Sequence, residues 1–152
     1  MKIVYIAHPI AGDPKRNAER VKQIVRRINL TTEMIVPFAP YLVDLEVLDD
    51  NNPRQRKRGI KNDHELLMRG FIDELWLYGQ RISQGMLEEA KLCIRLGIPV
   101  VAMSHKAEEE YGKIHTYREL WETDICPECQ EIRCDSDCAN LGDRKQNTYD
   151  NP

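Results

Sequence analysis

Long apolar runs are absent from this chain of 152 residues, and so is a large excess of either charge. No stretch approaches the roughly 20 apolar residues that a membrane span needs. The formal net charge is −3 with mixed signs, which argues against a nucleic-acid-binding face. The N-terminus enters a strand pattern directly and carries no small-residue cleavage site, so we expect no signal peptide and a cytoplasmic location.

Two common nucleotide-binding fingerprints are also missing. The sequence holds neither G-x-G-x-x-G after its first strand nor G-x-x-x-x-G-K-[ST], which disfavours a dinucleotide dehydrogenase and a P-loop enzyme. His64 and Glu65 begin like the H-E-x-x-H signature of zinc proteases, but Met68 stands where the second histidine must be. That class is therefore excluded.

Short apolar runs alternate with amphipathic segments along the first two thirds of the chain. Strands are expected at residues 2–7, 34–38, 72–78 and 98–103. A helix is expected after the N-cap Asp13 and Pro14, others at 61–70 and 84–96, and a short helix followed by a polar loop at 41–59, which includes the basic run 54–58. Repeated strand–helix units predict an α/β fold with a doubly wound parallel sheet.

Two loops of this fold, at residues 7–12 and 79–85, are expected at the carboxyl edge of the sheet, where such folds bind ligands. The second loop leads into a helix through Ser83 and Gly85, and the carboxylate of Glu89 follows six residues after the serine. A helix N-terminus offers unpaired N–H groups that suit a phosphate. The segment therefore predicts a site for chemistry on a phosphorylated sugar.

These segments resemble the nucleoside 2-deoxyribosyltransferase-like superfamily, which includes deoxyribonucleoside 5′-monophosphate N-glycosidases and many phage-encoded relatives. The resemblance covers roughly residues 1–105 and rests on Tyr5 to Gly12, Asn17, Pro37, Asp73, Ser83-x-Gly85-x-x-x-Glu89 and the segment 97–100. It implies a Rossmann-like fold that assembles as a homodimer or larger oligomer. It also implies cleavage of the N-glycosidic bond of a nucleoside or nucleotide.

The resemblance implies a role for each matching residue. Glu89 matches the catalytic nucleophile, Tyr5 matches the residue that orients it, and either Asp63 or Glu65 matches an assisting acid. The phosphate or sugar pocket is expected to include His8, Pro9, Gly12, Asp73, Ser83 and Gly85. His8 departs from the family pattern, which has glycine there. Its side chain either donates to the ligand or crowds the pocket and ends catalysis.

The chemistry follows from the residue types. Breaking a C1′–N bond builds positive charge on the sugar, which a carboxylate stabilises and captures. Release by water gives a hydrolase, and release by a second base gives a transferase. His8, Asp63 or Glu65 is available as proton donor to the leaving base. The step needs no metal or organic cofactor.

Less specific interpretations remain open for the same residues. Glu89 could be an exposed helix residue that pairs with Lys91 or Arg95. The crevice could hold a nucleotide without catalysis, in a sensing or sequestering protein, and His8 favours that alternative. An interaction protein whose cysteine-rich segment contacts a partner is the third hypothesis.

That cysteine-rich segment has the spacing C-x2-C-x4-C-x3-C. Four thiolates so close together in a reducing compartment favour a closed, structural zinc site, while two disulfides are the alternative. The expected zinc ligands are Cys126, Cys129, Cys134 and Cys138. The expected domains are a nucleotide-binding domain at 1–105, a connecting amphipathic helix at 106–124, a small zinc module at 125–139 and a flexible tail at 140–152.

Overall fold

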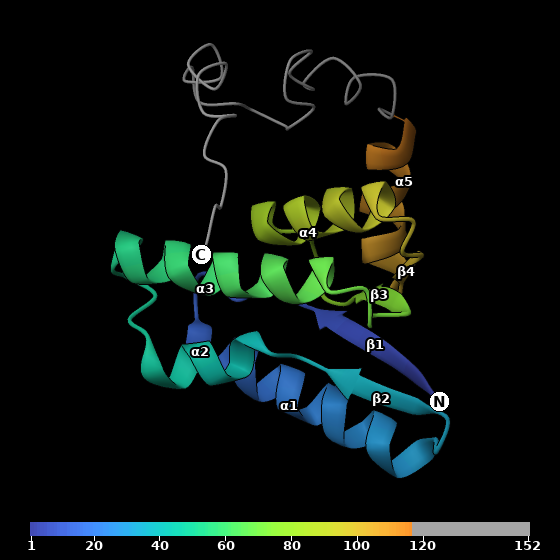
Figure 1. The fold of residues 1–152 in the computed structure, drawn as a ribbon, viewed down its shortest axis with the longest axis horizontal. Helices are drawn as coiled ribbons and strands as arrows, with labels where there is room; N and C mark the ends of the chain where they lie inside the picture. Colours follow the sequence, from blue (N-terminus) through green and yellow to red (C-terminus); the bar gives the residue numbers. More distant parts are fainter. Residues whose placement is uncertain (117–152) are drawn as a thin grey trace, which may run out of the picture. The chain divides into compact units, whose positions relative to one another are not determined.

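A computed structural model of the chain describes residues 1–116. Within them, four strands form one parallel sheet in the order β2-β1-β3-β4 (Figure 1). The strands are β1 (Lys2–Ala7), β2 (Ile35–Phe38), β3 (Glu74–Leu77) and β4 (Val100–Ala102). The predicted α/β fold with a parallel sheet is therefore confirmed, and the topology is consistent with a Rossmann-like arrangement. The zinc module that the sequence predicts lies outside the described residues.

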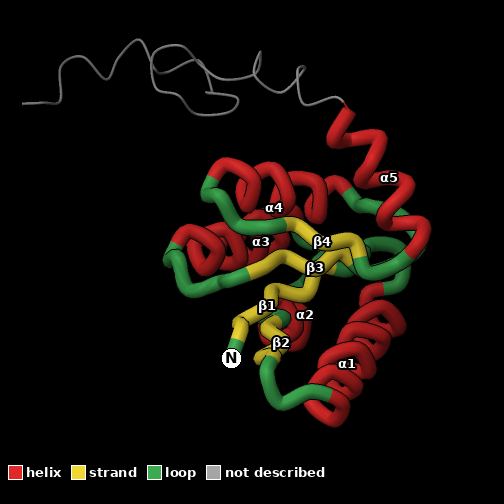
Figure 2. Tube along the Cα trace, turned by 90° about the vertical axis from the view of Figure 1, so that its right-hand side faces the viewer, coloured by secondary structure: helices red, strands yellow, loops and turns green. Residues whose placement is uncertain are grey.

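Helices cover both faces of the sheet. They are α1 (Pro14–Thr31), α2 (Tyr41–Val47), α3 (Pro53–Met68), α4 (Gln84–Arg95) and α5 (His105–Thr116). Figure 2 shows α3 and α4 against one face of the sheet and α1 against the other. Strand β1, which has neighbours on both sides, is the most buried, and Val4, Tyr5 and Ile6 have no exposed surface. Its nearly continuous apolar sequence is typical of such a strand.

The start of α3 differs from the expectation of a polar loop. The helix begins at Pro53, eight residues before the predicted position, because Asn52 caps it by accepting hydrogen bonds from the backbone N–H groups of Arg54 and Gln55. Asparagine followed by proline is a typical helix start. The basic run 54–58 is consequently the first part of a helix, which turns Arg56 toward the ligand edge.

Helix α5 begins as part of the main body of the molecule. Ala107 is fully buried and Tyr111 packs against the core, so the compact unit extends from Met1 to Gly112 rather than ending at residue 105. Among the helices of residues 1–116, none is long and apolar enough to cross a membrane. The expected cytoplasmic location stays a prediction.

Candidate active site

A cavity of about 380 Å³ opens at the carboxyl edge of the sheet, a size within the usual range of small-molecule sites. Its walls are the loop after β1, helices α2 and α3, the loop after β3 and the first turns of α4. The lining includes the charged residues Asp44, Asp50, Arg56, Asp63, Arg81 and Glu89. The chain leaves β1 toward β2 and leaves β3 toward β4, so the strand order reverses between β1 and β3, where open α/β sheets bind ligands.

Glu89 is held at this cavity by a residue of the central strand. The hydroxyl of Tyr5 donates a 2.8 Å hydrogen bond to Oε1 of Glu89. Tyr5 is fully buried, and its ring packs against Phe38 and Tyr41 at centroid distances of 6.4 and 6.3 Å. Tyr41 is fixed in turn because its hydroxyl donates to the carbonyl oxygen of Ile6 at 2.8 Å. The Tyr5 hydroxyl therefore has little freedom, and it orients the carboxylate.

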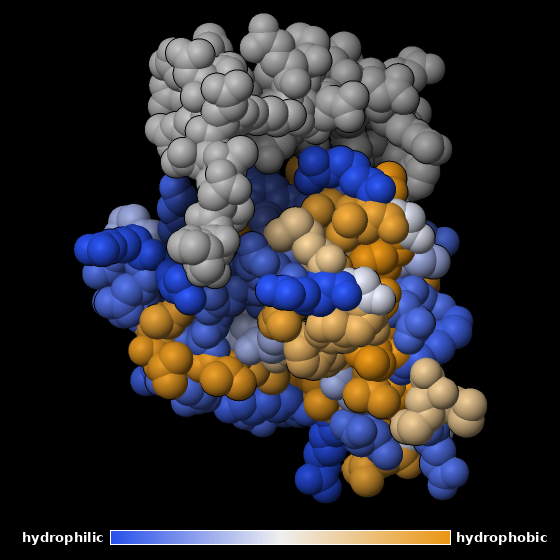
Figure 3. Space-filling model, viewed as in Figure 1, coloured by the Kyte–Doolittle hydropathy of each residue, from blue (hydrophilic) through white to orange (hydrophobic). Residues whose placement is uncertain are grey.

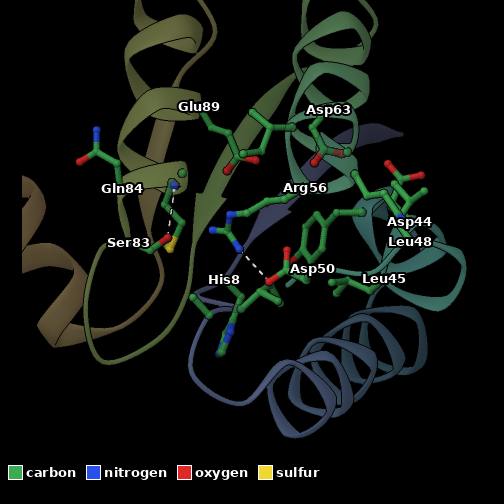
Figure 4. A pocket seen from close by; sticks show the side chains of 18 of the residues that line it. His8, Asp44, Leu45, Leu48, Asp50, Arg56, Asp63, Ser83, Gln84 and Glu89 are labelled. Carbon is green, nitrogen blue, oxygen red and sulfur yellow. Dashed lines mark hydrogen bonds and ion pairs between the residues drawn. The ribbon is translucent and has the colours of Figure 1, made fainter. Parts of the chain in front are cut away.

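Asp63 faces Glu89 across the cavity. Figure 4 shows the two carboxyl groups pointing toward one another from α3 and α4. Asp63 is buried, and its Oδ1 is without a hydrogen-bond partner among residues 1–116. A buried oxygen without a hydrogen-bond partner destabilises a folded protein. Protonation of the Asp63 carboxyl group or a hydrogen bond from a ligand would relieve this.

Burial raises the pKa of both carboxyl groups. Burial first, and then the negative charge of Asp44, raises the pKa of Asp63 to about 7. Burial first, and then the charge of Asp63, raises the pKa of Glu89 to about 8. The hydrogen bond from the Tyr5 hydroxyl to Glu89 opposes the rise for that group. Near neutral pH the two groups together hold at least one proton.

The structure separates the two residues proposed as the assisting acid. Glu65 is exposed on α3, and its carboxylate lies 3.9 Å from the guanidinium of Arg69. It does not line the cavity, whereas Asp63 does. Only Asp63 is placed to exchange a proton with a ligand above Glu89.

The N-terminus of α4 forms another wall of the cavity. The side chain of Ser83 caps the helix by accepting from the N–H of Met86. Gly85 lines the cavity, and a Cβ built there would have no heavy atom within 4 Å. With Arg81 in the preceding loop, this wall joins a helix dipole, free backbone N–H groups and a cation. It suits an anionic group.

His8 lies on the far side of the cavity from the carboxyl pair, as Figure 4 shows. Its Nδ1 donates to the carbonyl oxygen of Pro9 at 2.8 Å, which leaves Nε2 of the neutral ring as an acceptor. Burial lowers the pKa of His8, against the Pro9 hydrogen bond, and the charge of Arg20 lowers it further. His8 is a poorer proton donor than Asp63 for a base that leaves from above Glu89.

The loop after β3 packs closely on the His8–Pro9 segment. Gly79 has a φ of +110°, and a Cβ there would lie 2.7 Å from Cδ of Pro9, so only glycine fits without movement. Ser104 donates to the carbonyl oxygen of Gly79 at 2.6 Å, and Glu110 on α5 accepts from the N–H of Ile82. These supports join segments that are distant in the sequence, so no local pattern predicts them.

Two predicted pocket residues lie elsewhere. Asp73 stands at the amino edge of the sheet, where its Oδ2 accepts from the N–H of Ile3 at 2.7 Å. Gly12, with a φ of +101°, turns the chain into α1 and does not line the cavity. Pro9 lines a second, polar hollow that continues from the cavity past His8.

A metal centre is not visible in the part of the chain that the structure covers. Within residues 1–116, no group of three or more histidine, cysteine, aspartate or glutamate side chains is arranged to hold a metal ion. The cysteines predicted to bind zinc, at positions 126, 129, 134 and 138, lie outside this part. Cys93 is buried in α4.

Comparison with known proteins gives one match. Residues 2–103 match a family described as a domain of unknown function (DUF7768), and this match spans more than half of the chain. The chain belongs to that family. The comparisons with curated proteins and with solved structures give no match.

Proposed function

We propose that the protein cleaves the N-glycosidic bond of a nucleoside or nucleoside 5′-monophosphate, by hydrolysis or by transfer of the sugar. The observation that carries this proposal is the 2.8 Å hydrogen bond from the buried Tyr5 hydroxyl to the Glu89 carboxylate, with Asp63 opposite. A fixed nucleophile beside a second carboxyl group of raised pKa is the pairing that retaining glycoside chemistry requires.

The proposed reaction has two steps. The Glu89 carboxylate attacks C1′ of the sugar as the C1′–N bond breaks, and the electron pair of that bond goes to the base. The base takes a proton from Asp63. In the second step, water attacks C1′ and gives a proton to Asp63 as the Glu89 carboxylate leaves. A second nucleobase in place of water makes the reaction a transfer.

The raised pKa values supply the proton that the reaction needs, and because the pKa of Glu89 is the higher of the two, binding of the substrate must shift this proton from Glu89 to Asp63. The pair holds at least one proton near neutral pH, so an acid is available beside the nucleophile. The hydrogen bond from Tyr5 favours the ionised form of Glu89, and the positive charge that develops on the sugar favours it further. Asp63, whose Oδ1 has no partner within residues 1–116, keeps the proton until the base leaves.

A substrate phosphate is proposed at the N-terminus of α4. Ser83 and Gly85 would present backbone N–H groups to it, and Arg81 would add a charge. Gly85 has open space where a side chain would stand, which lets a ligand approach the backbone.

Product analysis tests the proposal. The protein is incubated with a panel of deoxynucleosides and nucleoside 5′-monophosphates, and free base is measured by chromatography. We expect base release that Glu89→Gln lowers by about a thousandfold, as is common when a covalent nucleophile is removed. Glu88→Gln is the matched control: Glu88 is adjacent but points to Gln84, at 3.0 Å, and does not line the cavity.

A nucleotide-binding protein without catalysis is the second candidate, because the His8 side chain occupies part of the cavity wall. The same panel separates the two functions. Release of base that persists in Glu89→Gln would contradict the proposed mechanism. Thermal stabilisation by a nucleotide, with no base released from any panel member, would favour the binding function.

Zinc binding by Cys126, Cys129, Cys134 and Cys138 is a separate proposal, carried by their spacing alone. Its test is the metal content of the purified protein. About one zinc per chain is expected, with loss after all four cysteines are changed to serine. Zinc that remains in that variant would contradict it.

Assembly into a homo-oligomer is proposed as well. Figure 3 shows apolar side chains gathered over α2 and over the strand ends beside it. Val43 and Val47, one turn apart on α2, have 67% and 70% of their surface exposed. Exposed apolar patches of this kind often mark subunit contacts. Light scattering that gives the mass of a single chain would contradict this proposal.

A further inference from the structure

One face of helix α3 lines the cavity, and its chemical character changes along the helix. Arg56, Gly59, Ile60 and Asp63 follow one another at helical spacing, and all four line the cavity. Leu45 and Leu48 of α2 also line it. This part of the cavity therefore has Asp63 toward one end and Arg56 toward the other, with apolar side chains and the Asp44 carboxylate between them.

The cation is tied to a carboxylate of its own. Nη1 of Arg56 donates to Oδ2 of Asp50 at 2.7 Å, and both residues line the cavity (Figure 4). The Arg56 side chain is 43% exposed, and that of Asp50 24% exposed. An arginine has five N–H donors, and a carboxylate has two acceptor oxygens. Arg56 therefore has N–H donors left for a ligand, and Asp50 beside it has an acceptor oxygen left.

The spacing along α3 fits a bicyclic base. Seven residues separate Asp63 from Arg56, so their backbone positions lie about 10 Å apart along the helix axis. A base that takes its proton from Asp63 and lies along α3 would reach toward Arg56 with its far edge. Gly59 lies between them and adds no side chain to the cavity, and a Cβ there would be in ordinary contact, at 3.5 Å, with Oδ2 of Asp44.

We propose that Arg56 and Asp50 form a specificity-determining pair that recognises a 6-oxo-2-aminopurine, the base of guanine nucleotides. Guanine offers two neighbouring acceptors, O6 and N7, which match a guanidinium. Its N1–H and 2-amino donors match a carboxylate. Adenine has a donor where guanine has O6, and pyrimidines are too short to reach. This inference rests on the proposed function for the placement of the sugar and the leaving base.

A phosphate is the less favourable ligand for Arg56. The charge of its guanidinium is already met by Asp50, and a phosphate near Arg56 would also approach that carboxylate. The α4 wall offers an anion its backbone N–H groups and the cation of Arg81, for which no ion pair is found within residues 1–116.

Binding to a non-hydrolysing variant tests this inference. In the Glu89→Gln protein, the Kd values of dGMP, dIMP, dAMP, dCMP and TMP are measured by calorimetry. We expect dGMP to bind about tenfold or more tightly than dAMP, a normal discrimination for a bidentate arginine contact. A second substitution in this protein, Arg56→Ala or Arg56→Lys, should remove the preference. Lysine keeps the positive charge but cannot donate the two parallel hydrogen bonds of a guanidinium. Asp50→Asn should remove the preference for dGMP over dIMP.

Arg58→Ala is the matched control, since Arg58 is an exposed arginine of the same helix that does not line the cavity. It should leave the preference intact. Equal weakening of all five nucleotides by Arg56→Ala, with retention by Arg56→Lys, would overturn the inference and make Arg56 a phosphate contact. A preference for dAMP or for a pyrimidine nucleotide would also overturn it.

Base release by the wild-type protein separates the two proposals. Guanine preference that depends on Arg56, with no base released from any nucleotide, supports the inference and contradicts the proposed cleavage. Base release at equal rates from all five nucleotides, unchanged by Arg56→Lys, supports cleavage and overturns the inference.

Discussion

The two edges of the same parallel sheet hold carboxylates in opposite ways. At the amino edge, the carboxylates of Asp73 and Glu74 both accept hydrogen bonds from neighbouring groups of the sheet. Asp73 accepts from the N–H of Ile3, while its own N–H donates to the carbonyl oxygen of Ile3 at 2.9 Å. Glu74 accepts from Lys2 with one oxygen and from Trp76 Nε1, at 2.8 Å, with the other. The Lys2 hydrogen bond lowers the pKa of Glu74.

At the carboxyl edge the same chemical group is left short of partners. Asp63 and Glu89 are withdrawn from water and face each other, and their pKa values rise to about 7 and about 8. The hydrogen bonds to the amino-edge carboxylates hold the strands in register. The carboxyl groups at the other edge lack such partners, which leaves them available to a substrate. The contrast therefore favours the carboxyl edge as the position of the proposed site, because the charges there are not accounted for by folding alone.

Among the tests of this comparison, the largest effect is expected from Tyr5→Phe, which removes the hydroxyl that donates to Glu89. A hydrogen bond to a charged group contributes roughly 1.5–3 kcal/mol, so kcat should fall about 10- to 100-fold with little change in KM. Rates of base release measure this. Tyr41→Phe, which changes a hydroxyl bonded to Ile6 instead, is the control. Equal losses in both variants would show that packing, not orientation of Glu89, matters.

The next effect is on the pH dependence of stability. A carboxyl group whose folded pKa is raised stabilises the protein below its unfolded pKa, near 4, and loses that contribution as pH rises through its folded pKa. Because of Asp63 and Glu89, the free energy of unfolding should therefore fall as the pH rises from about 5 to about 8. Because Asp63 is buried, its share of this fall should be about 1–3 kcal/mol. Denaturant unfolding of wild type and Asp63→Asn at both pH values measures the difference.

At the amino edge, the pH dependence of stability is expected to have the opposite sign. The pKa of Glu74 is lowered, so its contribution is present at neutral pH and is lost as pH falls. Glu74→Gln should leave the decline from pH 5 to pH 8 unchanged, whereas Asp63→Asn should flatten it. An equally steep decline in Asp63→Asn would remove the contrast between the two edges.

The sequence was sufficient where the determining signals are local. The apolar run of β1, the Asp13–Pro14 start of α1 and the Ser83 cap of α4 each specify their element within a few residues, and the structure has all three. The position of Glu89 at the carboxyl edge follows from that cap, because the helix carries it there.

Long-range contacts could not be predicted in the same way. The choice between Asp63 and Glu65 depends on which side of α3 faces the cavity, and the missed start of α3 hid that Arg56 is on the same face. Asp73 was predicted for the pocket, but its partner Ile3 is 70 residues away in the sequence. No local pattern reveals at which edge of the sheet such a residue finds its hydrogen bond.

A smaller effect is expected from Gly85→Ala, and it should separate binding from folding. The added methyl group meets no protein atom within 4 Å, and alanine in place of a helical glycine stabilises by roughly 0.5–1 kcal/mol. The methyl group enters the cavity, so KM for a nucleotide should rise about fivefold, or roughly 1 kcal/mol. A thermal melt and steady-state kinetics measure the two effects. A rise in stability without any change in KM would place the phosphate elsewhere.

The smallest effect is expected at the amino edge, from Asp73→Ala. Its carboxylate is exposed and holds only the N–H of Ile3, so the free energy of unfolding should fall by about 1 kcal/mol, the usual contribution of one such hydrogen bond. Asp73→Asn keeps an acceptor oxygen and should recover most of that loss. Neither variant should change kcat/KM for base release, because Asp73 lies at the opposite edge from Glu89. A loss of kcat/KM in both, with normal unfolding, would mean that the amino edge also serves the substrate, and the contrast between the two edges would then fail.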